Sequence, residues 1–326
     1  MCNFQKQFFL ISLYSKVNSI LKVYLANPRG FCAGVERAIK IVELALKKYS
    51  PPVYVRHEIV HNKHVVENLR QRGAVFVEEI TDIPENAVTI FSAHGVSKKV
   101  EKESIRKHLK IIDATCPLVK KVHLQAQKFE KEGKKIILIG HRNHPEIQGT
   151  SGQLKQEVFI VEKISDVEKI PYSRKDNIAY VTQTTLSVDD TKNIVNKLKI
   201  KYPNIVGSEL NNICFATQNR QDAVKKLAKV TDNIFVIGAN NSSNSNRLRD
   251  IAESYGAKAY LFQDENEIKR SLLYGIKTLG ITAGASAPEI LVRNTIKKIA
   301  EIRKVEIKNL EGITENIKFK IPSVLV

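Results

Sequence analysis

The chain has 326 residues, 43% of them hydrophobic, which is enough to bury a core in two or three domains. Its net charge of +18 favours anionic substrates or acidic partners, but its lysines are scattered singly and form no nucleic-acid-binding motif. No run of about 18 apolar residues indicates a membrane span, and the four cysteines lie too far apart for a secreted disulfide framework, so a cytoplasmic location is expected.

The first 20 residues are excluded from the predicted fold. They contain no acidic side chain and include the short apolar run Phe8-Phe9-Leu10-Ile11. This composition is compatible with an organelle-targeting leader or with a start that lies further along the chain.

One pattern then occurs three times, and in each copy a cysteine directly precedes a predicted helix. Cys32 follows the apolar strand-like segment Val23-Tyr24-Leu25. Cys116 is followed by Pro117, a residue favoured in the first turn of a helix. Cys214 precedes a third segment with apolar residues at helical spacing.

Each copy continues with two short apolar runs that end in polar clusters. Alternating strands and helices predict parallel sheets, and ligands of such sheets gather at the carboxyl ends of the strands. We therefore predict an α/β fold of three similar α/β domains with parallel sheets, which a pseudo-threefold axis would relate. The predicted parts are a leader or extension at 1–20, α/β units at 21–113, 114–211 and 212–300, and a C-terminal segment at 301–326 that packs back on the core.

Three cysteines brought together at such an axis suit a metal cluster. Thiolates are favoured at helix N-termini, and a [4Fe-4S] cube held by three of them leaves one iron open, whereas zinc needs a fourth ligand. A zinc metallohydrolase is an alternative because residues 57–61 match H-E-x-x-H. That motif needs a helix, but the β-branched and aromatic residues around it predict a strand and a loop. A basic nucleic-acid-binding protein with a structural cluster is the other alternative.

The polar clusters are rich in hydrogen-bond donors, which suit a phosphate-bearing anion. We expect the imidazoles to carry part of a positive charge near neutral pH. Glu146 stands among histidines, where burial would raise its pKa and suit it to proton delivery, with a helix-capping or ion-paired role as the alternative. Thr184 could position it. The other candidates for substrate binding are His61, His94, His144, Ser242, Ser243, Asn244 and Ser286.

Several ordered motifs together resemble the LytB/IspH family of 4-hydroxy-3-methylbut-2-enyl diphosphate reductases. The resemblance covers about residues 21–326. It rests on the segments at residues 26–35, 60–62, 92–95, 113–119, 140–146, 182–190, 214–221, 241–245 and 282–288.

The resemblance implies a trefoil of three α/β domains around one central iron-sulfur cluster. Cys32, Cys116 and Cys214 would hold this [4Fe-4S] cluster and leave one iron site open. Glu146 would supply protons, and Thr184 would lie near the substrate hydroxyl. The histidines, serines and asparagine named above would bind a small allylic diphosphate. Two electrons from a ferredoxin or flavodoxin type donor would then yield isopentenyl or dimethylallyl diphosphate, the last step of the non-mevalonate pathway.

Overall fold

The computed structural model describes residues 20–207 and 212–326, so the predicted leader, apart from Ile20, lies outside the described residues. The chain divides into two compact units. Unit 1 contains the residues up to Phe31 together with Asn219–Asn316, and unit 2 contains Cys32–Gln218 and Ile317–Val326. Within the described ranges, no helix combines the length and the apolar character needed to cross a membrane.

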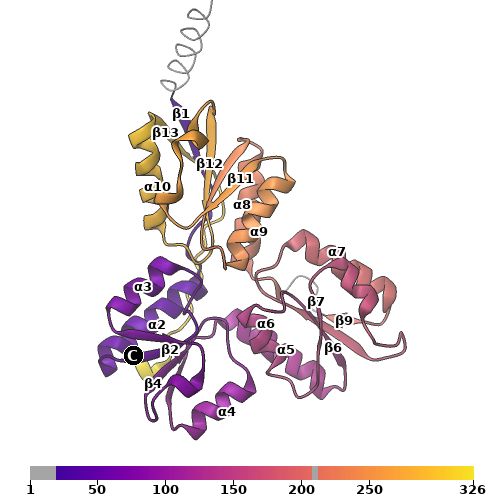
Figure 1. Ribbon diagram of the computed structural model, residues 1–326. Helices are drawn as coiled ribbons and strands as arrows, with labels where there is room; N and C mark the ends of the chain where they lie inside the picture. Colours follow the sequence, from indigo (N-terminus) through magenta and orange to yellow (C-terminus); the bar gives the residue numbers. More distant parts are fainter. Residues whose placement is uncertain (1–19, 208–211) are drawn as a thin grey trace, which may run out of the picture. The chain divides into compact units, whose positions relative to one another are not determined.

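Unit 1 is built on a five-stranded parallel sheet of order β11-β10-β12-β1-β13. Figure 1 shows α10 on one side of this sheet and α8 and α9 on the other. The strands are β1 (Leu21–Leu25), β10 (Asn233–Ile237), β11 (Lys258–Phe262), β12 (Thr278–Ala283) and β13 (Val305–Asn309), and the helices are α8 (Phe215–Ala228), α9 (Ser243–Ser254) and α10 (Glu289–Ile302).

Both faces of this sheet are covered by apolar side chains. Phe235 and Ile237 pack with α10 on one face, while Ile234 and Val236 pack with α8 and α9 on the other. Since successive strand residues point to opposite faces, a continuous apolar run such as β10 is the pattern expected for a strand buried on both sides.

Unit 2 contains two four-stranded parallel sheets, of order β3-β2-β4-β5 and β7-β6-β8-β9. The first sheet has β2 (Val53–Arg56), β3 (Ala74–Val77), β4 (Val88–Phe91) and β5 (Lys110–Asp113). The second has β6 (Lys135–Ile139), β7 (Phe159–Val161), β8 (Ile178–Thr182) and β9 (Val206–Gly207).

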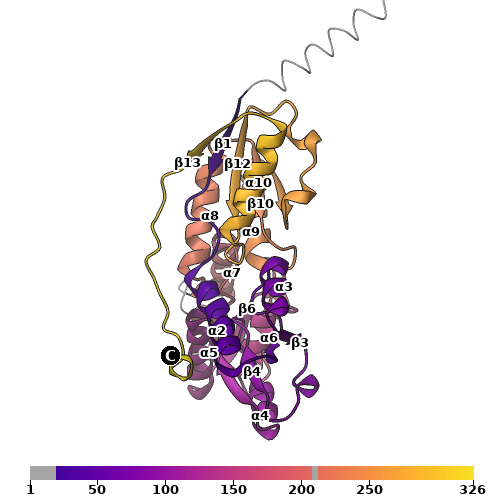
Figure 2. The same ribbon diagram turned by 90° about the vertical axis from the view of Figure 1, so that its left-hand side faces the viewer.

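Six α-helices in the described part of unit 2 accompany these sheets. They are α2 (Ala33–Tyr49), α3 (Lys63–Gln71), α4 (Lys98–Arg106), α5 (Pro117–Lys131), α6 (Pro145–Ser151) and α7 (Val188–Lys201). The short helix η6 (Ser323–Leu325) near the C-terminus lies beside α2 (Figure 2). There Lys48 Nζ donates a 2.8 Å hydrogen bond to the carbonyl of Val324.

The three sheets share one strand order. In each sheet the first strand lies between the second and the third, and the strand that precedes a cysteine pairs with the third. That last strand is β5 before Cys116, β9 before Cys214 and, in unit 1, β1 before Cys32. The first strand that the structure describes thus completes the third sheet, and β13 adds a further edge.

This common order confirms the predicted α/β class with three similar parallel sheets. It also shows how the repeat is organised, because each cysteine stands between the last strand of one sheet and the helix that follows. The pseudo-threefold arrangement and the predicted unit boundaries stay predictions.

Candidate active site

The three predicted metal-ligand cysteines all belong to unit 2 and all stand at the beginning of a helix. Cys32 is the N-cap of α2, Cys116 is the N-cap of α5, and Cys214 immediately precedes α8. The backbone N–H groups of the last two bond to loops that follow neighbouring strands. Cys116 N donates to Ala93 O at 3.0 Å, and Cys214 N donates to Thr184 O at 3.0 Å.

The thiols are free and lie close enough to influence one another. A methyl group added at Gly34 would lie 2.7 Å from the Cys116 sulfur and 3.9 Å from the Cys32 sulfur, so the site needs glycine there. Burial, and then the charge of Cys32, raise the pKa of Cys116 to about 12 and that of Cys214 to about 11. Thiols so placed release their protons when a metal cation binds their sulfur atoms. Three free thiols, each at the beginning of a helix, therefore fit an iron-sulfur cluster.

A mononuclear zinc site finds no support in the described residues. They contain no group of three His, Cys, Asp or Glu side chains that could hold a single metal ion. The H-E-x-x-H segment at residues 57–61 is irregular chain between β2 and α3, which confirms the prediction that it forms no helix. A four-iron cube is wider than one ion, so its ligands need not converge on a point.

The three candidate histidines of unit 2 form one cluster. Their ring centroids are 4.2 Å apart for His61 and His94, 5.4 Å for His61 and His144, and 5.7 Å for His94 and His144. They come from the loops after β2, β4 and β6, at the carboxyl ends of three strands. Ser92 Oγ lies 3.2 Å from His94 Nδ1, and Glu58 Oε2 lies 3.2 Å from His61 Nδ1.

The expectation of partly charged imidazoles is wrong for two of these histidines. Burial, reinforced by the charge of His61, holds the pKa of His94 well below its usual value and lowers that of His144 to about 3. His144 Nδ1 accepts a 3.1 Å hydrogen bond from the backbone N–H of Glu146, so its neutral ring carries the proton on Nε2. The His144 ring therefore offers a neutral N–H donor instead of a cation.

Glu146 is a buried carboxyl group in the first turn of α6, with 2% of its surface exposed. Its Oε1 accepts a 2.7 Å hydrogen bond from Thr184 N, and its Oε2 accepts one of 2.8 Å from Thr184 Oγ1. Burial raises its pKa to about 7 although these hydrogen bonds oppose the shift. Near neutral pH the carboxyl group therefore exchanges a proton readily, as a general acid must.

The remaining four candidates lie together in unit 1, at the carboxyl ends of two adjacent parallel strands. Ser242 is the N-cap of α9 and accepts a 3.3 Å hydrogen bond from Ser245 N, with Ser243 next to it in the first turn. Asn244 Oδ1 accepts a 2.9 Å bond from Ala285 N, the neighbour of Ser286. Hydroxyl and amide groups at the N-terminus of a 12-residue helix form an anion-binding arrangement.

The sequence analysis missed the residues that join the two halves of unit 2. A methyl group added at Gly149 of α6 would lie 3.2 Å from the carbonyl carbon and oxygen of Gly95, so the two backbones touch there. The buried ring of His123, which belongs to α5, also packs against Gly95. This contact fixes the turn that carries His94 against the helix that carries Glu146.

Thr217 was also missed. Its backbone N–H donates to the Cys214 sulfur at 3.4 Å, and its Oγ1 lies 3.1 Å from the same atom. Thr217 stands three residues after Cys214, at the beginning of α8. Because capping interactions join residues at this spacing, a search for them would have found Thr217.

Comparison with known proteins agrees with this arrangement. Residues 23–300 match the protein family described as LytB protein. The chain belongs to the LytB family. Among curated relatives of this LytB family member, the 4-hydroxy-3-methylbut-2-enyl diphosphate reductase of Haemophilus influenzae (strain PittEE) is 51% identical over 308 residues, which are 94% of this chain and 98% of the relative. That of Pseudomonas aeruginosa (strain LESB58) is 52% identical over 309 residues, with 94% and 98% covered.

Solved structures of LytB relatives also match. The E-1-hydroxy-2-methyl-but-2-enyl-4-diphosphate reductase from Plasmodium falciparum superposes with a TM-score of 0.91 at 40% identity, over 94% of this chain and 97% of that one. A structure described as (E)-4-hydroxy-3-methyl-but-2-enyl diphosphate reductase, the terminal enzyme of the non-mevalonate pathway, gives a TM-score of 0.61 at 33% identity, over 87% and 100% of the two chains.

Proposed function

We propose that this chain is a 4-hydroxy-3-methylbut-2-enyl diphosphate reductase, the terminal enzyme of the non-mevalonate pathway. Identity of 51% with a reductase of that name over 94% of the chain supports the proposal. The structural observation that carries it is the buried Glu146 carboxyl group, with a pKa of about 7, whose charge acts on the pKa of Cys214 in the cysteine cluster. A proton source beside a set of soft metal ligands is what reductive removal of a hydroxyl group requires.

The cofactor we propose is one [4Fe-4S] cluster with one open iron site, held by Cys32, Cys116 and Cys214. Their free thiols, their helix-capping positions and the glycine required at residue 34 support this assignment. When bound, the cluster would supply two electrons one at a time and a Lewis acid for the substrate hydroxyl group.

Glu146 delivers the proton with which the substrate hydroxyl group leaves as water. Thr184 holds both carboxyl oxygens of Glu146 through its N–H and hydroxyl groups, which fixes the direction of proton transfer. The complete reaction consumes two electrons and two protons, breaks one C–O bond, forms one C–H bond and releases one water. Protonation at either end of the allyl group gives isopentenyl or dimethylallyl diphosphate.

Hydrogen-bond donors are the proposed ligands of the diphosphate, and the rings of His94 and His144 among them are neutral because burial lowers their pKa. In unit 2 these donors are His61, His94 and His144. In unit 1 they are Ser242, Ser243, Asn244 and Ser286, where the N-terminus of α9 adds the positive end of its dipole.

The electron donor we propose is an acidic ferredoxin or flavodoxin type protein. The net charge of +18 supports this choice, because opposite charge accelerates the encounter of two proteins.

Turnover of the synthetic substrate tests the function directly. Anaerobically prepared protein, supplied with reduced methyl viologen, is expected to convert 4-hydroxy-3-methylbut-2-enyl diphosphate to the two five-carbon diphosphates. No product after reconstitution with iron and sulfide would refute the proposed function.

A further inference from the structure

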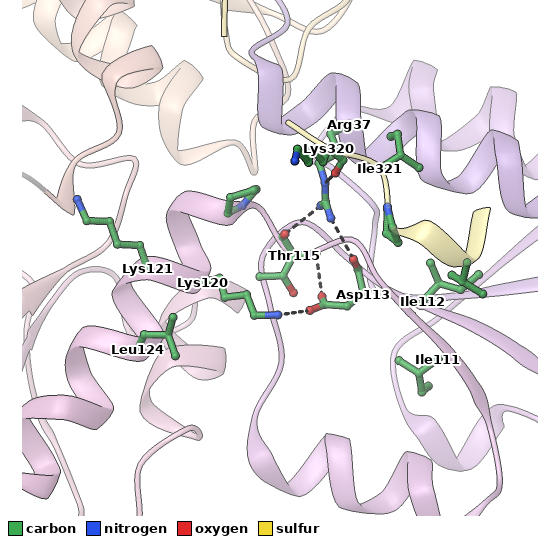
Figure 3. A pocket seen from close by; sticks show the side chains of 13 residues that line it. Arg37, Ile111, Ile112, Asp113, Thr115, Lys120, Lys121, Leu124, Lys320 and Ile321 are labelled. Carbon is green, nitrogen blue, oxygen red and sulfur yellow. Dashed lines mark hydrogen bonds and ion pairs between the residues drawn. The ribbon is translucent and has the colours of Figure 1, made fainter. Parts of the chain in front are cut away.

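A pocket of about 580 Å³ in unit 2 lies against the segment that carries Cys116. Thr115 and Pro117, the chain neighbours of Cys116, both line it. Figure 3 shows Lys121 and Leu124 of α5 on one side of this pocket and Lys320 and Ile321 of the C-terminal segment on the other. None of these residues belongs to the proposed substrate-binding set.

Arg37 fixes the walls of this pocket. Its NH1 atom donates to the carbonyls of Thr115 at 3.1 Å and Ala114 at 3.3 Å, and its Nε donates to the carbonyl of Lys320 at 2.8 Å. One guanidinium group thus joins the C-terminal segment to the backbone on the N-terminal side of Cys116. The pocket is therefore held by the same contacts that hold the cysteine segment.

The rim of the pocket is basic, and part of its surface is apolar and exposed. Asp113 is the acidic residue among those that line it, and its charge is paired with Lys120 at 3.2 Å. Lys121 and Lys320 are exposed and add positive charge. Leu124 of α5 also lines the pocket and is 60% exposed. An apolar patch with a cationic rim has the composition of a protein-binding surface for an acidic partner.

We propose that this pocket is the docking surface for an acidic one-electron carrier protein, an inference that rests on the proposed function. A carrier seated here would contact Thr115 and Pro117, which line the pocket and are the chain neighbours of Cys116. The reduced carrier gives up one electron at each of two encounters per turnover, and the substrate C–O bond is the final acceptor. Docking of the carrier involves neither the side chains that bind the substrate nor the proton donor Glu146.

Charge reversal of the two exposed lysines tests this surface. In the Lys121→Glu/Lys320→Glu variant, the KM for reduced flavodoxin is expected to rise about tenfold, while turnover with reduced methyl viologen stays within about twofold of wild type. The Lys121→Arg/Lys320→Arg variant keeps the charge and is expected to keep the KM. The matched control is Lys269→Glu/Lys297→Glu, which reverses two exposed lysines of unit 1 and is expected to leave KM within about twofold of wild type, because it alters the net charge equally but not the pocket.

Each outcome separates the docking surface from the reaction itself. An unchanged KM for flavodoxin, an equal rise in the control variant, or an equal loss with both reductants would overturn the docking surface and leave the proposed function intact. A wild-type protein that is a dimer, and that Lys121→Glu/Lys320→Glu converts to a monomer, would assign the pocket to a second copy of this chain and also overturn the proposal. If the wild-type protein has no activity with reduced methyl viologen, the proposed function is refuted, and the docking surface falls with it.

Discussion

The ionised form of Glu146 is costly in the folded chain. The residue is 2% exposed, and burial raises its pKa from 4.5 to about 7. Since one pKa unit corresponds to about 1.4 kcal/mol, the fold disfavours the carboxylate by about 3 kcal/mol relative to a solvated one. The native state therefore binds a proton that the unfolded chain has already released, and the stability contributed by this group falls as the pH rises from 4.5 toward 7.

The same shift predicts the pH dependence of turnover. With a pKa of about 7, Glu146 is about 90% protonated at pH 6 and about 10% protonated at pH 8. If its acid form supplies the proton, kcat falls about tenfold between these two pH values when that step limits the rate.

Replacing Glu146 with Gln keeps the shape of the side chain and removes the proton. We expect kcat to fall about 100-fold or more, with the remaining rate independent of pH between 6 and 8 and with the iron content unchanged. The assay is anaerobic turnover with reduced methyl viologen at saturating substrate. Glu157→Gln, the same substitution at an exposed position of unit 2, is the control and should behave as wild type. A fully active Glu146→Gln enzyme, or a variant that keeps the wild-type pH profile, would remove Glu146 from the acid role.

Three further substitutions separate the other parts of the site. Cys116→Ser should lower the iron bound per chain after anaerobic purification, because an alcohol is a weaker iron ligand than a thiolate; full iron content would argue against this ligand. Ser242→Ala removes the N-cap of α9, so it should raise KM and lower the free energy of unfolding in urea by about 1 kcal/mol. The control Ser187→Ala removes the N-cap of α7 and should lower the free energy of unfolding by a similar amount but leave KM unchanged. Gly149→Ala should cost about 1–3 kcal/mol and lower kcat, since the added methyl group meets backbone 3.2 Å away and must displace α6; an unchanged unfolding midpoint would contradict the tight packing there.

The local elements of this fold could be predicted from the sequence, but the membership of its sheets could not. A helix follows each of the three cysteines as the repeat predicted, and strands such as β2, β6 and β10 are short apolar runs of the predicted kind. The pairing of β1 with β12, in which Val23 lies beside Leu279, joins strands at opposite ends of the chain. Hydrophobic periodicity reports which face of a strand is buried, and it carries no information on the neighbour at such a distance in sequence.

The candidate residues of the site were visible because each polar cluster ends an apolar run. Their electrostatic state was not visible, because it depends on distances between loops. His61 and His94 come from loops after different strands, and the pKa of His94 falls so far because the ring is buried and because His61, 4.2 Å away, and His144 add to the shift. The contact of Gly95 with Gly149 was hidden for a similar reason, since a glycine in a sequence does not show whether a turn or a neighbouring backbone requires it.

The stoichiometry of electrons to product tests the proposed reaction most directly. Anaerobic protein with about four irons and four sulfides per chain, as the proposed cluster requires, is mixed with a known amount of reduced methyl viologen and limiting 4-hydroxy-3-methylbut-2-enyl diphosphate. Two viologen radicals oxidised for each five-carbon diphosphate formed is the expected result. Viologen oxidation that does not depend on substrate, or substrate loss without electron uptake, would contradict reductive dehydroxylation by this chain.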